Sequence, residues 1–327
     1  IDAKPGKDMV VVLGKNTHLS DDGSQLLASK PGVVKQEDHQ LHVYEMLTVE
    51  GDVDFGVGNI KYSGDLVING SIMPGFTVET DGDILIRGNV ESATVASRNG
   101  TVTILQGVIG KGDTKVYAKA GIHLHFAQEA LLSTDGRLTV EKNLLHCNCR
   151  CDTLEMSGRD SSVVGGEVVA FSWIQIAVSG NETGVETRLT LIDRERERKE
   201  EKLKELDKLY KEIYEKFEPI KKQVQTKAAI MKKAGAVISD RTKAEMKKWI
   251  DAYNSFSVKL KYIQQKSNEL KTELAQATGG DGHIRVSGNL FPGTIVTLYG
   301  ITKMIRDPCS GKVFRFTQGG LDDGATS

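Results

Sequence analysis

Residues 64–82 read GDLVINGSIMPGFTVETDG, and residues 282–300 read GHIRVSGNLFPGTIVTLYG. The glycines, the Pro-Gly pair and the alternating apolar residues fall at the same offsets in both stretches. The shared positions are Leu66, Ile68, Gly70, Pro74, Gly75 and Val78 in the first copy, and Ile284, Val286, Gly288, Pro292, Gly293 and Val296 in the second. A chain that repeats a short unit, leaves it and returns to it is typical of a solenoid with an insertion.

The same unit recurs between the two copies. Glycines at 64, 82 and 100 are 18 residues apart, and Gly121 and Gly136 continue the series at a similar average spacing. Each glycine precedes a short strand with apolar residues at every second position, which gives the strand one apolar face. Stacked coils can bury such faces together, which favours a right-handed parallel β-helix. A left-handed hexapeptide helix fits poorly, and a β-sandwich with coincidental glycines is the alternative.

Composition divides the chain into four parts. Residues 1–50 fit the repeat poorly and are predicted to form an N-terminal capping region, since a solenoid end must be covered. Residues 51–189 are the first part of the β-helix, 190–278 an inserted arm, and 279–327 the final coil and tail. The chain opens at Ile1 without a signal peptide, so we expect a preceding N-terminal part to be missing.

The arm has the pattern of two helices. Its apolar residues are spaced alternately by three and four positions. They are Leu203, Leu206, Tyr210, Ile213, Phe217, Ile220, Val224 and Met231, then Met246, Trp249, Tyr253, Phe256, Leu260, Ile263, Ser267, Leu270 and Leu274. Heptads of this kind predict an antiparallel coiled coil, with helices of roughly 40 residues that project about 60 Å. Gly235 and Ser239-Asp240 mark the break, and Pro219 is expected to kink the first helix.

The arm also offers the best candidate for a partner contact. Ala236, Val237 and Ile238 are apolar residues at its expected tip, although they are also able to fold over the end of the coiled coil. Residues 193–273 contain 22 Lys+Arg and 15 Asp+Glu, a net charge of +7, so the rest of the chain carries −8. A basic arm can attract an acidic partner, or it can be an ordinary solvated helix surface with ion pairs. Nucleic acid is disfavoured because no arginine-rich or aromatic stripe accompanies the lysines.

Three cysteines form the string that most resembles a site. Cys147, Cys149 and Cys151 alternate, so in a strand they share one face at about 6.5 to 7 Å spacing. Tetrahedral zinc needs thiols closer together, so we expect structural core residues, with metal binding as the alternative. His123 and His125 alternate with Ile122, Leu124 and Phe126, so the apolar set should point inward and the histidines outward. No third ligand is visible beside them.

The sequence indicates no catalytic, cofactor or metal site. Carboxylates that a glycosidase or lyase would cluster on one strand face are scattered, at Asp83, Asp135, Glu141 and Asp152. The glycine-rich stretch 107–112 lacks the helix of a phosphate-binding loop and is predicted to be a corner of the solenoid. No run of 18 apolar residues occurs, so no membrane span is expected, and the cytoplasm is the expected compartment.

Several glycine-anchored segments resemble one known family. They are residues 58–60 with 63–70, 82–91, 164–170 and 288–300, together with a helical hairpin before the last coil. The pattern resembles the flagellar assembly protein A family of bacterial proteins, formerly a domain of unknown function, over nearly the whole chain. The resemblance implies a right-handed β-helix with a coiled-coil arm, no known catalytic activity and no cofactor.

The resemblance also implies a role in flagellation and motility. The expected partners are proteins, namely a component of the sugar-phosphotransferase system or the polar flagellar machinery. We therefore predict a non-enzymatic cytoplasmic scaffold or regulator that binds proteins through a solenoid face or the arm. A self-assembling structural β-helix, which would form a homo-oligomer, is the alternative, and a carbohydrate-active β-helix enzyme is a weaker one.

Overall fold

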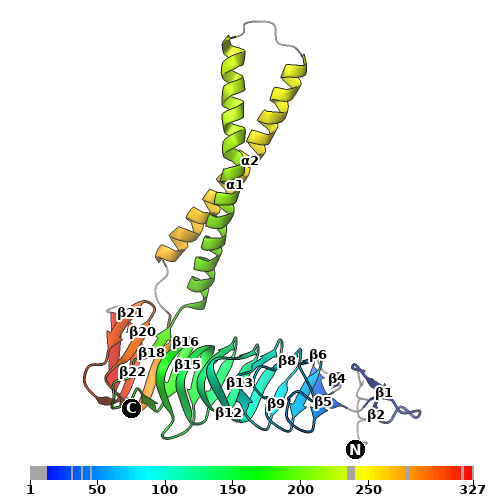
Figure 1. Cartoon of the computed structure of the whole chain (residues 1–327), viewed down its shortest axis with the longest axis vertical. Coiled ribbons are helices and arrows are strands. Elements are labelled where there is room, and N and C mark those ends of the chain that lie inside the picture. The colour runs from blue at the N-terminus through cyan, green and yellow to red at the C-terminus, as the bar shows by residue number, and fades with distance from the viewer. Residues whose placement is uncertain are drawn as a thin grey trace, which may run out of the picture. The chain divides into compact units, whose positions relative to one another are not determined.

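The computed structural model of the chain consists of a stack of β-strands and a pair of long helices (Figure 1). It describes residues 13–30, 32–37, 40–44, 46–233, 240–276, 280–317 and 320–325. The chain forms two compact units, one of Ile1–Ile192 with Gly280–Ser327 and one of Asp193–Gly279. The first is called the solenoid and the second the hairpin.

The solenoid has three faces, named A, B and C, whose strands pair in parallel from one coil to the next. Face A contains β5 (Met46–Val49), β7 (Asp65–Ile68), β9 (Ile84–Ile86), the first parts of β12 (Thr101–Ala118) and β13 (Gly121–Thr134), β14 (Arg137–Val140), the last parts of β15 (Asn143–Met156) and β16 (Ser162–Ile176), and β19 (His283–Leu290). Face B is narrow, and it includes β10 (Val90–Glu91) and β17 (Val178–Ser179).

Face C contains β6 (Ile60–Tyr62), β8 (Thr77–Thr80), β11 (Thr94–Ser97), the later parts of β12 and β13, the middle parts of β15 and β16, β18 (Thr187–Leu191) and β20 (Thr294–Leu298). In Figure 1 these coils lie side by side along the solenoid. The chain leaves the solenoid after β18 on face C to form the hairpin, and it returns at β19 on face A. The hairpin is therefore inserted at the corner between these two faces.

Columns of apolar side chains fill the inside of the solenoid. On face A, residues at equivalent positions of successive coils pair in register, and each is at most 1 % exposed. This column is Leu66, Ile84, Val102, Ile122, Leu138, Leu154, Ile174 and Ile284. Because successive side chains of a strand point to opposite faces, the alternate residues point outward. Burial of each such aliphatic side chain contributes about 1.5 to 3 kcal/mol.

One glycine shows how closely the coils approach each other. Gly166 lies opposite Cys147 on face C and has a φ of 75°. A Cβ at this position would clash with the backbone carbonyl of Cys147. The position therefore requires glycine twice over, for its left-handed backbone and for the space between neighbouring coils.

Antiparallel strands cover the last coil of the solenoid, and antiparallel β-hairpins precede its first coil in the sequence. At the C-terminal end, β21 (Ile301–Met304) pairs with β20, while β22 (Cys309–Thr317) pairs with β19 and with β23 (Gly320–Ala325). The last parallel strands therefore do not offer open edges, which reduces unwanted pairing with other chains. Before the first coil, two hairpins form, β1 (Thr17–Leu19) with β2 (Leu26–Ala28) and β3 (Val33–Glu37) with β4 (Gln40–Tyr44). The first strand with a parallel pairing is β5, which pairs with β7 and lies at the end of residues 1–50, the stretch predicted to be the cap.

The hairpin consists of α1 (Arg194–Lys233) and α2 (Asp240–Gln276). The Asp193 carboxylate caps α1 by accepting hydrogen bonds from the backbone N–H groups of Glu195 and Arg196, at 2.8 and 3.1 Å. The helices are antiparallel, since Lys199 contacts Glu273 near one end and Lys227 contacts Glu245 near the other. Between them, the Phe217 and Tyr253 rings lie 5.1 Å apart.

The predicted fold class is confirmed, since the chain is a parallel β-helix with an inserted antiparallel helical hairpin. The spacing of three and four also predicted the hairpin seam, in which Phe217, Leu260 and Ile263 are buried. The helix α1 continues through Pro219 without a break. One detail of the prediction is wrong. Phe126 does not point into the core but is half-buried at the corner between faces A and B, opposite Gly107, where the register shifts.

Candidate interaction surfaces

The alternating cysteines lie in the core. Cys147, Cys149 and Cys151 face inward from β15 on face C, each is at most 3 % exposed, and all are free thiols. Burial raises the pKa of Cys147 to about 11 and that of Cys151 to about 12, and it also raises the pKa of Cys149. They therefore act as small apolar side chains, as the sequence predicted. In the described part of the chain, no group of three or more His, Cys, Asp or Glu side chains is arranged to hold a metal ion.

The two outward histidines are also where the alternation placed them. His123 is exposed, whereas His125 is half-buried, and its Nδ1 lies 2.7 Å from Oε2 of Glu141 in the next coil. The carboxylates described above as scattered along the sequence also do not form one cluster in the structure. Asp83 and Glu141 make separate contacts at different coils, and Asp152 accepts a hydrogen bond from Ser172.

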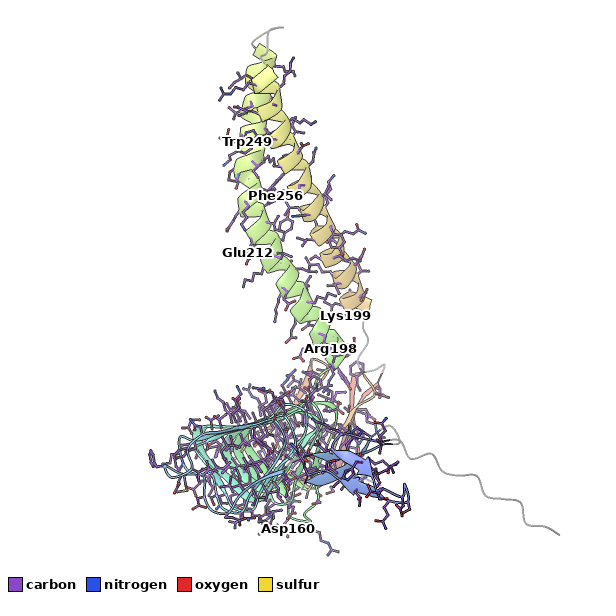
Figure 2. The ribbon with its side chains drawn as sticks, turned by 90° about the vertical axis from the view of Figure 1, so that its right-hand side faces the viewer. Asp160, Arg198, Lys199, Glu212, Trp249 and Phe256 are labelled. Atoms are coloured by element: carbon purple, nitrogen blue, oxygen red, sulfur yellow. The ribbon has the colours of Figure 1, made fainter. Side chains whose placement is uncertain are left out.

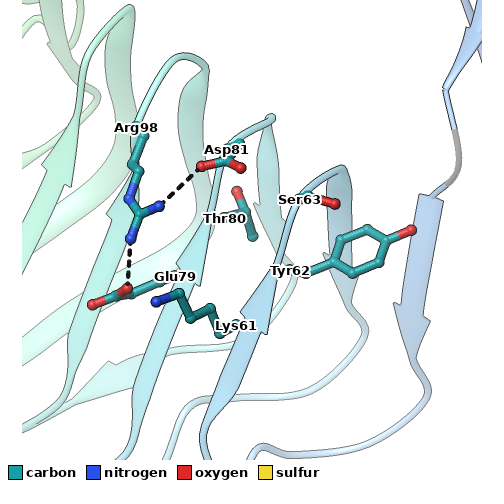
Figure 3. A pocket seen from close by; sticks show the side chains of 7 residues that line it. All are labelled: Lys61, Tyr62, Ser63, Glu79, Thr80, Asp81 and Arg98. Carbon is teal, nitrogen blue, oxygen red and sulfur yellow. Dashed lines mark hydrogen bonds and ion pairs between the residues drawn. The ribbon is translucent and has the colours of Figure 1, made fainter.

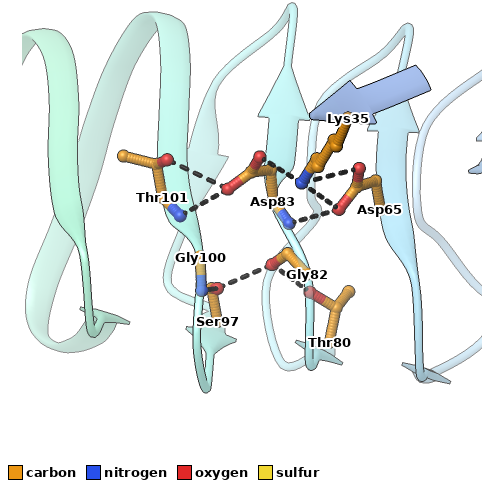
Figure 4. Close-up of polar contacts among 8 residues, drawn as sticks. All are labelled: Lys35, Asp65, Thr80, Gly82, Asp83, Ser97, Gly100 and Thr101. Carbon is orange, nitrogen blue, oxygen red and sulfur yellow. Dashed lines mark hydrogen bonds and ion pairs between the residues drawn. The ribbon is translucent and has the colours of Figure 1, made fainter. Parts of the chain in front are cut away.

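A ladder of side-chain oxygens follows the corner where face C turns into face A (Figure 4). Oδ1 of Asp65 accepts a hydrogen bond from the backbone N–H of Asp83 at 2.8 Å, and Oδ1 of Asp83 accepts one from the N–H of Thr101, also at 2.8 Å. Each acceptor lies one coil before its donor. Gly82 forms part of this corner, because a Cβ there would meet the carbonyl group of Gly64 in the coil below. The aspartates thus satisfy backbone groups that the corner would otherwise leave without partners.

Lys35, from the β3–β4 hairpin, forms ion pairs with both aspartates of this ladder. Nζ of Lys35, on β3, lies 3.1 Å from Oδ2 of Asp65 and 3.0 Å from Oδ2 of Asp83. Burial lowers the pKa of Lys35, but its hydrogen bonds to the two aspartates outweigh this effect and hold the pKa above its usual value. Burial likewise raises the pKa of Asp83, but the Thr101 N–H and Lys35 outweigh it, and the pKa is lowered. We call this contact the Lys35 clamp.

A shallow pocket lies on face C of the first coils (Figure 3). Its charged side chains are Lys61, Glu79, Asp81 and Arg98. The Arg98 guanidinium bridges Glu79 and Asp81, at 3.3 Å from each. Both carboxylates thus contact one guanidinium, and all three side chains are exposed to solvent. The pocket therefore shows surface ion pairing, with no pair of carboxylates arranged for acid–base chemistry.

The hairpin presents a different surface, which is dominated by charge. In Figure 2, Arg198 and Lys199 lie on the first turns of α1, and Trp249 and Phe256 lie further along on α2. Lys199 pairs with Glu273 at 2.9 Å, and Lys227 pairs with Glu245 at 3.7 Å and lies over the Trp249 ring. The candidate contact residues Ala236, Val237 and Ile238 lie outside the described residues. Neither α1 nor α2, over the residues described, is apolar enough over a sufficient length to cross a membrane.

The comparisons with known proteins agree with this architecture. The family model described as the Flagellar Assembly Protein A beta solenoid domain matches residues 45–321. The chain belongs to this family. The match to the flagellar assembly protein A model includes every parallel coil of the solenoid and the hairpin, and it begins after β4. No curated protein and no solved structure matches the chain.

The Lys35 clamp is the feature that sequence reasoning missed in this member of the flagellar assembly protein A family. The aspartates had a signal, since Asp65 and Asp83 both follow a corner glycine at a spacing of 18. Lys35 had none, because it lies 30 residues before Asp65 in a segment that fits no repeat.

Proposed function

We propose that this protein is a non-enzymatic cytoplasmic scaffold of flagellar assembly and motility that acts by binding other proteins. The observation that carries the proposal is the family match over residues 45–321. The architecture supports it, because a solenoid with backbone pairing between all its coils is a rigid support for extended binding surfaces. The expected partners are a component of the sugar-phosphotransferase system or the polar flagellar machinery.

The use of the polar groups supports a binding role over a catalytic one. Asp65 and Asp83 bind backbone N–H groups and the Lys35 ammonium, and Arg98 forms ion pairs with Glu79 and Asp81. General acid–base catalysis needs a group that exchanges a proton near neutral pH. The carboxylate of Asp83 is instead held in its charged form, with a lowered pKa.

The experiment compares swimming of cells that carry the full chain with cells in which the hairpin is replaced by a short Gly-Ser linker between Ile192 and Gly280. If partners bind the hairpin, the linker version should accumulate to the same level and fail to restore motility. Restored motility would indicate that the binding surface lies on the solenoid. A chain that is dispensable for flagella altogether would contradict the proposal.

Self-assembly through the first coil is a second candidate function, supported by one exposed end. Among the described residues, β5 pairs only with β7 and β6 only with β8, so the outer edges of both strands lack a partner strand. Phe55 is 97 % exposed beside them, and Met46 is 44 % exposed. Light scattering against concentration tests this function, because pairing of two first coils would raise the mass from that of one chain to that of two, and a constant mass of one chain would exclude it. A Phe55→Ser variant should weaken the association.

A further inference from the structure

The net positive charge of the hairpin is concentrated in one part of it. Residues 216–233 of α1 and 240–261 of α2, here together called the distal half, contain 12 Lys+Arg and 4 Asp+Glu. Residues 193–215 and 262–273, the proximal half, contain 10 Lys+Arg and 11 Asp+Glu. The net charges are therefore +8 and −1. Both halves share the same helices and the same apolar seam, so helix formation alone does not account for the difference.

The proximal half neutralises its own charges. Arg196 pairs with Glu200 at 3.0 Å, Arg198 with Glu195 at 2.9 Å, and Lys266 with Glu269 at 2.6 Å. The distal half has only four carboxylates for twelve cations. Glu218 pairs with Lys222 at 3.4 Å, and Glu245 contacts both Lys227 at 3.7 Å and Arg241 at 4.0 Å. Lys243 and Lys247 stand four positions apart, a like-charge spacing that destabilises an isolated helix.

We propose that the distal half of the hairpin is a docking surface for an acidic protein. This proposal rests on the proposed function, which is protein binding, and adds that the partner is acidic. Lys216, Lys232, Lys247 and Lys248 are exposed and come from both helices. Their ammonium groups attract carboxylates at distances up to the Debye length, about 8 Å at physiological salt. Such a field steers a partner of opposite charge and accelerates its association.

Side-chain chemistry favours protein over nucleic acid. Eleven of the twelve cations are lysines, and Arg241 is the single arginine. Arginine is the residue that binds phosphates through two parallel hydrogen bonds, whereas lysine acts as a hydrated point charge. The distal half also exposes large apolar side chains, with Ile230 at 60 % and Val258 at 67 %. An apolar centre inside a polar rim is the usual composition of a protein interface.

The same apolar residues argue against a lipid surface. A helix that lies in a membrane interface needs an apolar stripe along one side, built from residues three or four positions apart. Ile230 lies on α1, and Ile250 and Val258 lie eight residues apart on α2. Val258 has a single exposed apolar neighbour at that spacing, Tyr262, just outside the distal half, so the pattern does not extend into a stripe.

The test measures binding of the full-length protein to three fluorescent probes, an acidic amphipathic peptide, a short DNA duplex and phosphatidylserine vesicles. A distal variant carries Lys216→Gln, Lys232→Gln, Lys247→Gln and Lys248→Gln. A matched proximal variant carries Lys204→Gln, Lys208→Gln, Lys211→Gln and Lys271→Gln, at positions that are also exposed. A third variant has arginine at the four distal positions, which keeps the charge and guards against an effect of helix packing. Circular dichroism checks the helix content of each.

The expected result is peptide binding that weakens about tenfold in the distal variant, changes less than about twofold in the proximal variant and persists with arginine. Higher salt should weaken it further. Equal losses in the two glutamine variants, loss with arginine at unchanged helix content, or no peptide binding at all would overturn the inference. Preference for DNA or vesicles at physiological salt would overturn it as well. If the linker version abolishes motility while the distal variant binds the peptide normally, the inference fails and the proposed function stands.

Discussion

The solenoid and the hairpin both bury apolar residues, but they do so in different ways. In the solenoid, side chains such as Leu138 are completely covered by the coils on either side and belong to columns that run from coil to coil. In the hairpin, most seam residues are half-buried, and Phe217, Leu260 and Ile263 are the buried apolar residues among those described. The solenoid is therefore expected to be sensitive to every inward residue, whereas the hairpin tolerates change over most of its surface.

This difference decides where charge can accumulate. In the solenoid, charged groups at the corners take part in the backbone ladder, as Asp65 and Asp83 do. In the hairpin, backbone groups are satisfied within each helix, so side chains outside the seam are free to carry a net charge of +7. Because the fold does not require particular side chains on this surface of the hairpin, selection for partner binding can determine them.

The largest contrast should follow from removing one inward side chain in each unit. Leu138→Ala should lower the free energy of unfolding of the solenoid by about 3 kcal/mol or more, because the neighbouring coils cannot collapse into the cavity. Leu206→Ala, at a half-buried seam position, should cost about 1 kcal/mol. Urea denaturation can separate the units, since Trp173 reports on the solenoid and Trp249 on the hairpin. Similar losses in the free energy of unfolding for the two variants would contradict the expected difference between the solenoid and the hairpin.

A second contrast lies within the solenoid. Gly166→Ala should cost about 2 to 3 kcal/mol, since it adds a side chain at positive φ and a clash with Cys147 in the preceding coil. Gly300→Ala is the matched control, because Gly300 also has a positive φ, 92°, but has open space around its Cβ position. It should cost only about 1 kcal/mol. Thermal unfolding of both variants measures the difference, and equal shifts would mean that coil spacing is not the limiting factor.

The buried thiols should make the solenoid sensitive to alkali. Their raised pKa values mean that the unfolded chain loses these protons first, so stability is complete below the usual thiol pKa of 9.0 and falls as pH rises toward 11. The loss is at most about 1.4 kcal/mol for each thiol and pH unit. Urea denaturation followed at Trp173 measures it. Cys149→Ala should flatten the slope, and an unchanged slope in that variant would assign the effect to other groups.

The smallest expected effect concerns the Lys35 clamp. Lys35→Met should cost less than about 1 kcal/mol, because the clamp is partly exposed to solvent. Amide exchange in β3 and β4 should accelerate while that in β9 stays unchanged, and Lys61→Met serves as the control. The lowered pKa of Asp83 means that the contribution of the clamp is present above the usual aspartate pKa and disappears as pH falls below it. Unchanged amide exchange at neutral pH would show that other contacts hold the β3–β4 hairpin in place.

The parts of the fold that the sequence predicted are those with a period. Alternation placed Leu66, Ile68 and the three cysteines inward, and the spacing of three and four predicted the hairpin seam. Phe126 departed from the alternation, because the register shifts at a corner and the periodicity of a strand does not continue through it. The Lys35 clamp and the antiparallel strands at the C-terminal end depend on contacts between non-repeating segments, for which a period gives no signal.

The position of the insertion has a consequence for the order of folding. The final coil can close only after β19 and β20 have been synthesised, and 87 residues, Asp193–Gly279, separate them from the coils they complete. An unstructured segment of that length would make closure slow and entropically costly. The two helices fold through local contacts, so an early hairpin would bring Ile192 and Gly280 toward each other before the solenoid is finished. Variants that delay helix formation should therefore slow the docking of the C-terminal coil even where the native stability of the solenoid is unchanged.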